Sequence, residues 1–406
     1  MEVIGENGII NKMEIQEKWE YLTIESVCIK KGIVRGPFGG ALKKSDFTKS
    51  GIKVYEQKNA IYKDVNLGSY FIDYKKYNEL SRFEVFEGDF IISCSGTIGK
   101  IFIIPSRFPK GIINQALLKL TTNDRVIDKS FFYYYFEWDK FQEIIIDNTQ
   151  GGAMKNLVGM PIFRVTPITL PPLPEQQAIA EVLSDTDNLI QALEKQIAKK
   201  RLIKQGVMQE LLTPKEGWEK KRLGDIVEIL DHLRKPLNES NRQKMTGDIP
   251  YCGANGIVDF VDRYVINDSI ILIAEDGGYF DEYLTRPIAY QMKGKCWVNN
   301  HAHILKSKND YDQDFIFYSL VHKNILDFIN GGTRAKLNKG ELINITINTS
   351  PSKSEQSKIA IIITNISEEI NVLEDKLKKY KNLKQGLMQQ LLTGKIRLIK
   401  HHEKVH

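Results

Sequence analysis

One long segment occurs twice in this sequence, and the duplication constrains the fold more than any other feature. Residues 175–215 and 355–395 align without a gap at a constant offset of 180, and 17 of the 41 aligned positions are identical. Internal similarity of this length indicates a repeated architecture, in which each copy contributes the same structural unit.

Each copy has the heptad periodicity of a coiled-coil helix. Apolar residues recur at spacings of four and three, which makes a narrow stripe rather than the broad face of a helix on a globule. Prolines before residue 175 and at 214 set the ends of the first helix. The predicted seam residues are Ile179, Leu183, Ile190, Leu193, Ile197, Val207, Leu211, Ile359, Ile363, Ile366, Ile370, Leu373, Leu377, Tyr380, Leu387 and Leu391.

The simplest way to bury two such stripes in one chain is to pack them against each other. At about 1.5 Å per residue, each helix would be roughly 57 Å long. We therefore interpret the pair as a spacer. The alternative is that both are core helices of one large domain, which the gapless repeat argues against.

The repeat extends to the segments before each helix. Trp19-Glu20 is echoed by Trp218-Glu219 at an offset of 199, so the repeated unit is a globular segment followed by a long helix. The predicted fold class is α+β, with two mixed α/β domains separated by the helical spacer. The predicted division is an N-terminal arm (1–18), a first domain (19–170), a central helix and linker (171–217), a second domain (218–350), and a C-terminal helix and tail (351–406).

Apolar runs and turn signals give a coarse element assignment in both globular segments. The first segment is expected to contain strands at 89–94, 100–104 and 162–168, and an aromatic helix at 131–146. The second is expected to contain strands at 269–274 and 342–347, and a helix at 315–329. The stretch 112–120 of the first segment parallels 298–305 of the second.

Bulk properties describe ordinary globular material of more than one domain. The chain has 406 residues, 42% of them hydrophobic, and a net charge of +6 without a basic block that would indicate nucleic acid by itself. No apolar run is long enough for a membrane helix, and no signal peptide is apparent, so we expect a cytoplasmic protein. Four scattered cysteines, without a CxxC pair, predict neither disulfides nor a zinc site.

The sequence offers no catalytic constellation. The turn Gly96–Lys100 fails as a phosphate loop, because Cys94 stands where a glycine is required and Ile101 where Ser or Thr is required. The pair His301-x-His303 lacks a third His or Cys ligand at a useful spacing. We therefore predict no catalytic residue, no metal and no cofactor bound by this chain.

Several motifs resemble the specificity subunit of type I restriction–modification enzymes, and the resemblance covers residues 19 to about 395. They are LPPLPEQQAIA at 170–180, KQGVMQELLT at 204–213, EQ and IA at 355–356 and 359–360, KQGLMQQLLTGK at 384–395, the SGTIG turn at 95–99 and GGT at 331–333. The second half departs from the family pattern, with SPSKS at 350–354 instead of a proline-rich entry and DGG at 276–278 at the turn.

The resemblance implies a non-catalytic recognition subunit for double-stranded DNA. Two target-recognition domains would each read one half of a split site, and two antiparallel helices would set the gap between the halves. Two modification subunits, which bind S-adenosylmethionine and methylate adenine, would dock on the chain. Restriction subunits that use ATP and Mg could then join the complex.

Candidate DNA-contacting residues gather in polar loops with glycines and few apolar residues. For each of them, ordinary solvated surface is the alternative. They are Arg35, Lys43, Lys44, Ser45, Ser95, Thr97, Lys100, Lys155 and Asn156 in the first domain, and Arg234, Lys235, Asn238, Arg242, Lys244, Tyr279, Arg334 and Lys336 in the second.

Two other functions compete with DNA recognition. A fused methyltransferase–nuclease would bind S-adenosylmethionine without partners. A coiled-coil protein-binding scaffold would show no sequence-selective DNA binding when modification subunits are added.

Overall fold

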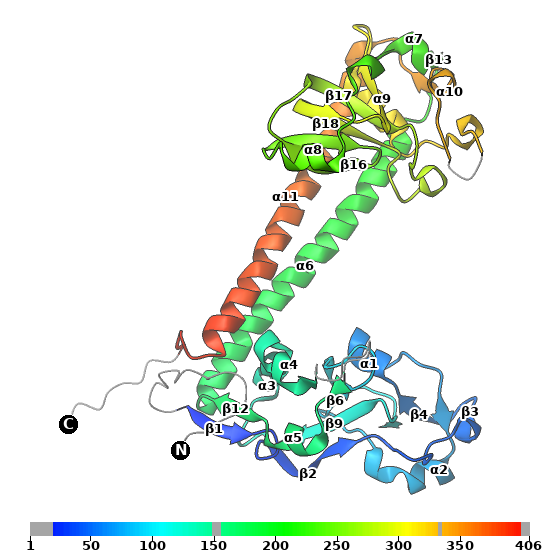
Figure 1. The fold of residues 1–406 in the computed structure, drawn as a ribbon. Coiled ribbons are helices and arrows are strands. Elements are labelled where there is room, and N and C mark those ends of the chain that lie inside the picture. The colour runs from blue at the N-terminus through cyan, green and yellow to red at the C-terminus, as the bar shows by residue number, and fades with distance from the viewer. Residues whose placement is uncertain (1–18, 148–155, 332–334, 399–406) are drawn as a thin grey trace, which may run out of the picture. The chain divides into compact units, whose positions relative to one another are not determined.

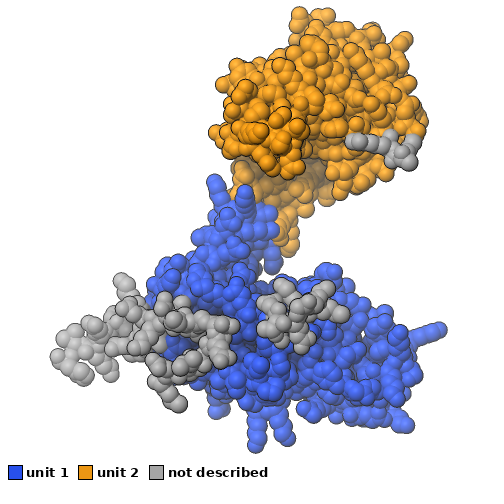
Figure 2. Space-filling view, in the orientation of Figure 1, with its two compact units in different colours: residues 1–192, 377–406 blue, residues 193–376 orange. Residues whose placement is uncertain are grey.

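The computed structural model describes residues 19–147, 156–331 and 335–398, which form two compact units. Unit 1 comprises residues up to 192 together with those from 377 onward, and unit 2 comprises residues 193–376 (Figures 1 and 2). Two helices of 39 residues, α6 (Leu173–Leu211) and α11 (Lys353–Leu391), each begin in one unit and end in the other. At about 1.5 Å per residue, each is roughly 58 Å long.

Within each unit the two long helices pack in antiparallel fashion. In unit 1, Lys384 Nζ of α11 lies 2.7 Å from Asp187 Oδ1 of α6. In unit 2, Arg201 pairs with Glu374 at 2.7 Å, and Lys215, beyond the end of α6, pairs with Glu355 at 3.8 Å. Residue numbers thus rise along one helix as they fall along the other. The predicted antiparallel pair is confirmed.

The predicted heptad seam faces inward along both helices. Every predicted seam residue is buried or half-buried, and Leu183 and its repeat partner Ile363 are 0% exposed. Several apolar positions outside the seam are exposed, as at Leu202, which is 70% exposed. The seam therefore follows from heptad geometry and not from hydrophobicity alone.

Unit 1 is built on two four-stranded sheets. The first has the order β2-β9-β6-β7 and is antiparallel, and the second has the order β3-β5-β4-β8 with a parallel β4–β8 pair. The strands are β2 (Cys28–Arg35), β3 (Phe47–Thr48), β4 (Ile52–Tyr55), β5 (Phe71–Ile72), β6 (Phe90–Ser93), β7 (Ile101–Ile103), β8 (Gly111–Ile113) and β9 (Leu117–Thr122). Two small antiparallel pairs join β1 (Glu20–Thr23) to β12 (Pro167–Leu170), and β10 (Ile146–Asp147) to β11 (Asn156–Leu157).

The main core of unit 1 lies between the first sheet, an aromatic helix pair and the long helices. Side chains of α3 (Lys129–Glu137) and α4 (Asp139–Ile145) pack with Ile179 and Leu183 of α6 and with Leu391 of α11. The end of the second copy therefore belongs to the same core as the start of the first. The other short helices are α1 (Gln57–Tyr62), α2 (Tyr74–Glu79) and α5 (Met160–Val165), with 3-10 turns η1 (Lys44–Asp46) and η2 (Ser81–Phe83).

Unit 2 has one six-stranded sheet of order β14-β19-β17-β18-β15-β16 and a separate β13–β20 pair. The strands are β13 (Glu219–Arg222), β14 (Val227–Ile229), β15 (Ile249–Gly253), β16 (Gly256–Val261), β17 (Ile266–Ala274), β18 (Ala289–Val298), β19 (Ala302–Ser307) and β20 (Thr346–Thr349). The helices are α7 (Leu223–Ile226), α8 (Glu239–Gln243), α9 (Gln313–Leu320) and α10 (Lys339–Leu342), with 3-10 turns η3 (Asp231–Leu233), η4 (Phe280–Glu282) and η5 (Leu326–Phe328). In the described ranges, every helix is too short or too polar to cross a lipid bilayer.

The glutamine of the repeated Glu-Gln pair, at 176 and 356, makes the same contact in both copies. Gln176 Oε1 accepts a hydrogen bond of 2.8 Å from the backbone N–H of Asp128, which caps α3. Gln356 Oε1 accepts one of 2.8 Å from the backbone N–H of Asp312, which caps α9. Both glutamines are 1% exposed, so each fixes its domain's aromatic helix to a long helix.

A second repeated contact uses lysines of the KQG motif. Lys384 of α11 lies over the ring of Tyr134 in unit 1, 5.4 Å from the ring centroid. Lys204 of α6 lies over the ring of Tyr318 in unit 2, at 5.8 Å. The two lysines are 180 residues apart, so the sequence offset is reproduced in three dimensions.

The expected elements differ from the observed ones at both aromatic helices and at the strand expected before each long helix. The stretch 112–120 contains two strands, because Asn114 forms a turn in which its Oδ1 accepts from the Ala116 N–H. The helix expected at 131–146 is broken at Trp138, and the one expected at 315–329 ends at Leu320. The strands expected at 162–168 and 342–347 are each a short helix followed by a strand.

Candidate nucleic-acid interface

A tight turn between β6 and β7 presents three of the candidate residues of unit 1. Ser95, Thr97 and Lys100 are all exposed there. The turn requires positive φ angles of 62° at Gly96 and 74° at Gly99, which glycine adopts without steric cost. The Gly99 and Lys100 N–H groups are bonded back to Ser93, so the side chains of Ser95, Thr97 and Lys100 are what this turn offers to phosphate or base edges.

The remaining candidates of unit 1 lie on other elements. Arg35 ends β2 and is half-buried, whereas Lys43, Lys44 and Ser45 are exposed around η1, next to the second sheet. Asn156 is exposed on β11. Lys155 lies outside the described residues. The structure therefore places the candidates on different sheets rather than in a single cluster.

The turn at 95–100 also borders a cleft of about 600 Å³ in unit 1. Three lysines from separate elements line it, Lys100 from the turn, Lys140 from α4 and Lys384 from α11. Glu137 and Asp139 line it as well, so its charge is mixed. The other lining residues are Gly99, Trp138, Gln142, Gln385, Met388 and Gln389.

In unit 2, four candidates lie in and around the short helix α8. Lys235, Asn238 and Lys244 are exposed, and Asn238 caps the helix by accepting from the Asn241 N–H. Arg242 is held inward, since its Nε donates to Asp259 Oδ2 at 2.8 Å. The loop thus offers three exposed polar side chains beside one that is already paired.

Two further candidates of unit 2, far apart in sequence, meet on one carboxylate. Arg234 and Lys336 both pair with Glu275, the lysine at 3.0 Å. Tyr279 lies nearby in sequence, 36% exposed, with the Arg286 guanidinium 4.2 Å from its ring centroid. Arg334 lies outside the described residues. A contact between DNA and Arg234 or Lys336 would compete with the Glu275 pair.

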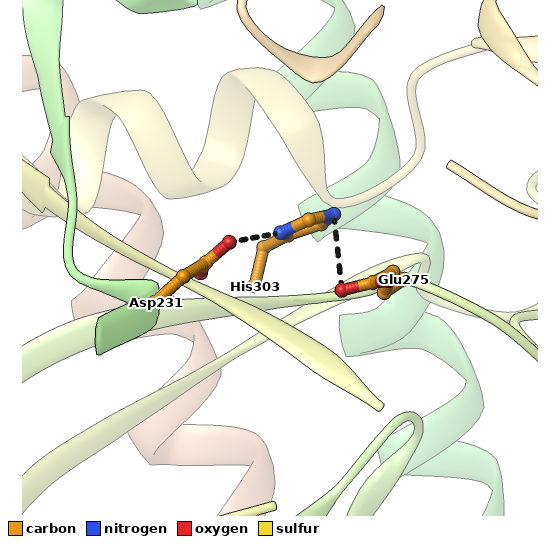
Figure 3. A group of neighbouring side chains, drawn as sticks. All are labelled: Asp231, Glu275 and His303. Carbon is orange, nitrogen blue, oxygen red and sulfur yellow. Dashed lines mark hydrogen bonds and ion pairs between the residues drawn. The ribbon is translucent and has the colours of Figure 1, made fainter. Parts of the chain in front are cut away.

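Glu275 belongs to a network centred on His303, which is 1% exposed. His303 Nδ1 lies 2.7 Å from Asp231 Oδ2, and its Nε2 lies 2.8 Å from the Leu337 carbonyl oxygen. Figure 3 shows Asp231 and Glu275 on either side of the imidazole, with 3.9 Å between Nε2 and Glu275 Oε2. The network joins η3, the end of β17, β19 and the loop before α10.

Asp231, Glu275 and His303 have the donor types of a divalent-cation site, and their ligand atoms lie within 4.8 Å of one another. However, Arg234 lies against both carboxylates, at 3.4 Å from Asp231 Oδ2. His303 Nε2 is also engaged by the Leu337 carbonyl. An ion would have to displace these groups, so we interpret the cluster as a hydrogen-bonded support for the loops.

The network lowers the pKa of both of its carboxyl groups. Burial alone would raise the pKa of Asp231, but the hydrogen bond and charge of His303, together with the Ile304 N–H and Arg234, lower it below 3.8. Burial opposes the shift at Glu275 in the same way, and hydrogen bonds from Arg234 and Lys336 outweigh it. Ionised carboxylates are thus favoured in the folded state.

This arrangement predicts a pH-dependent contribution to the stability of unit 2. Because the folded pKa of Asp231 lies below its unfolded value of about 3.9, the contribution is complete above that value and is lost as the pH falls through the folded pKa. We expect Asp231→Asn to lower the free energy of unfolding at pH 7 by roughly 1.5–3 kcal/mol. Urea denaturation of both proteins from pH 7 to pH 3 measures this effect. The difference in free energy of unfolding between the variant and the wild type should become smaller below pH 4. A difference that stays constant would contradict the assigned role of Asp231.

Arg82, Arg164 and Asp231 were not among the predicted functional residues. Arg164 reaches the first sheet, where its Nη2 donates to the Ile33 carbonyl at 3.3 Å. Arg82 lies on η2, a short turn without periodic signal. Tertiary packing alone brings Arg82 and Arg164 to Arg35, whereas Asp231 lies three residues before Arg234 and pairs with it locally.

Comparison with known proteins identifies the family. A family model described as "Type I restriction modification DNA specificity domain" matches residues 16–200 and again residues 215–382. The chain belongs to the type I restriction–modification specificity family. The two matched segments correspond to the two copies of the repeat, globular segment plus helix.

Curated relatives of this specificity family support the assignment. The type I restriction enzyme MjaVIII specificity subunit of Methanocaldococcus jannaschii is 26% identical over 358 residues, which cover 77% of this chain and 80% of the relative. A putative type I restriction enzyme specificity subunit of Haemophilus influenzae is 37% identical over 143 residues, 35% of this chain and 36% of the relative.

A solved structure shares the fold of this family member. It is described as the type I restriction–modification system S subunit from M. genitalium, with a TM-score of 0.62, 18% identity, and coverage of 96% of this chain and 98% of the other. The family model and the curated relatives make the chain a DNA specificity subunit, with a role in recognition rather than catalysis.

Proposed function

We propose that this specificity subunit recognises a two-part DNA target, each unit reading one half of it. The observation that carries the proposal is that the same side-chain contacts occur once in each unit. Gln176 and Gln356 bind helix caps in the same way, and Lys384 and Lys204 lie over equivalent tyrosines. Two similar reading units joined to one helix pair suit a target with two separate halves.

We further propose that the long helices dock two modification subunits. Apolar side chains outside the seam are available on both helices, and Ile203 and Leu383, which are 180 residues apart, are 42% and 50% exposed. An exposed apolar group at the same repeat position of both helices favours a protein partner at each. Because Ile203 and Leu383 recur with the repeat, two copies of the same partner can dock in equivalent ways.

In this proposal the modification and restriction subunits, and not this chain, carry out the chemical steps. S-adenosylmethionine would bind to the modification subunits, and ATP and Mg to restriction subunits that join the assembly. This chain would supply register through phosphate contacts and sequence preference through base contacts. The candidate residues on the β6–β7 turn and around α8 remain our predicted contacts.

The test is methylome sequencing of a host that expresses this chain with its modification subunit. We expect methylated adenine in one motif with two constant parts and a fixed number of unspecified base pairs between them. The host expressing the modification subunit alone is the control and should show no such motif. Methylation of a single uninterrupted motif would contradict the proposal.

A further inference from the structure

Unit 1 contains a pocket of about 270 Å³ on which three arginines converge. Arg35 comes from the end of β2, Arg82 from η2, and Arg164 from α5. The other lining residues are Ile33, Gly36, Phe38, Phe83 and Met160. Convergence from three separate elements makes the pocket a product of the tertiary fold rather than of one basic segment.

The pocket has more positive charge than the surrounding residues neutralise. Arg164 pairs with Glu25 at 2.7 Å. Among the residues that the structure describes, neither Arg35 nor Arg82 has a carboxylate partner within salt-bridge distance. Moreover, Arg35 Nη1 is buried and has no hydrogen-bond acceptor in the described ranges. A buried donor without an acceptor is costly, which favours an acceptor supplied from outside the chain.

Unit 2 has an arginine whose charge is neutralised within the chain. Arg234, a few residues after β14, pairs with Glu275 and Asp231. Arg35, at the end of β2, has no such carboxylate in the described ranges.

The rim and wall of the pocket suit a polyanionic chain passing over it. Phe38 is 63% exposed, and the Arg35 guanidinium lies 5.4 Å from its ring centroid, so an aromatic face borders the charge. The wall at Gly36 is fixed, since a Cβ there would lie 1.8 Å from the Asn114 carbonyl oxygen.

We propose that this pocket binds one phosphate of the DNA backbone at the half-site read by unit 1. Guanidinium groups match the oxygens of a phosphodiester in paired hydrogen bonds. A concave pocket admits a phosphate that projects from the duplex, whereas reading a base edge requires a side chain that projects into a groove. This inference rests on the proposed function, and it assigns Arg35 and Arg82 to positioning the DNA rather than to sequence preference.

The test uses the complex with the modification subunit and a duplex carrying the target found by methylome sequencing. Arg82→Gln is the principal variant because Arg82 is exposed, and Arg35→Gln is the second. Arg107→Gln is the matched control, an exposed arginine of unit 1 outside the pocket. Binding is measured across KCl concentrations, and also on duplexes in which a neutral methylphosphonate replaces one phosphate at a time in each half-site.

We expect Arg82→Gln to weaken binding roughly tenfold on cognate and non-cognate duplexes alike, and to reduce the slope of log K against log salt by about one. In the wild type, one methylphosphonate should weaken binding, and that substitution should have no further effect in Arg82→Gln. Arg107→Gln should behave as the wild type. An unchanged salt slope and methylphosphonate profile would overturn the phosphate pocket, as would a selective loss at one base pair, which would indicate base reading. If the wild-type complex recognised no two-part target, the proposed function itself would fail.

Discussion

Adding one heptad to each long helix, after Leu193 in α6 and after Leu377 in α11, is expected to lengthen the unspecified gap in the DNA target. Seven residues add about 10 Å of helix, which corresponds to about three base pairs at 3.4 Å each. Both insertions keep the spacing of the buried seam, because Leu193 and Leu377 are seam positions and a heptad preserves their phase. The two constant halves of the target should remain the same.

The variant with both insertions should bind its lengthened target more weakly than the wild type binds its own target. Three base pairs turn the second half-site by about 100° around the duplex, whereas one heptad turns the helix pair by only about 20°. Methylome sequencing reports the new gap directly. Alanine substitutions at the exposed residues Gln191 and Lys195, which leave the length unchanged, are the control. A double insertion that methylates the original spacing would disprove the role of the helices as a spacer.

Replacing Leu183 with alanine is expected to cost about 2–5 kcal/mol of unfolding free energy, the usual range for a fully buried leucine. Leu183 is 0% exposed and lies in the unit 1 core, where α6 meets the aromatic helices and the end of α11. The loss comes from removed apolar burial and from the cavity that remains. Because the same core contains both long helices, the substitution should also loosen their pairing within unit 1.

Leu202→Ala in the same helix is the matched control, since Leu202 is 70% exposed. Surface substitutions of this kind usually change stability by less than about 0.5 kcal/mol. Urea denaturation of the full chain, followed by circular dichroism, measures both variants. Equal losses for the two would mean that the heptad seam is not the stabilising interface.

The long helices were predictable because their pattern is long and doubly constrained. Heptad spacing fixes which residues face inward. The gapless repeat places inward-facing residues at equivalent positions of both helices, as at Leu183 and Ile363. Even the atypical entry of the second copy keeps its contact. Gln176 Nε2 donates to the Pro171 carbonyl and Gln356 Nε2 to the Ser350 carbonyl, each at 2.8 Å. A backbone acceptor does not depend on the proline side chain.

Short apolar runs were less informative. Residues 162–165 were expected to begin a strand, yet they belong to α5 (Met160–Val165). Pro161 in the first turn of this helix is a helix-start signal that outweighs the β-branched residues. The arginine pocket could not be predicted at all. Arg35, Arg82 and Arg164 are scattered in sequence, and only the packing of β2, η2 and α5 brings them together.

The most direct measurement of the central claim is the methylome of a chimaera in which residues 218–350 are replaced by the corresponding segment of another specificity subunit. The exchanged segment includes the six-stranded sheet of unit 2 and leaves both long helices intact. If each unit reads its own half, one constant part of the methylated motif changes, while the other part and the gap stay as in the wild type. A motif in which both halves change, or in which neither half changes, would contradict the claim that each unit reads one half of the target.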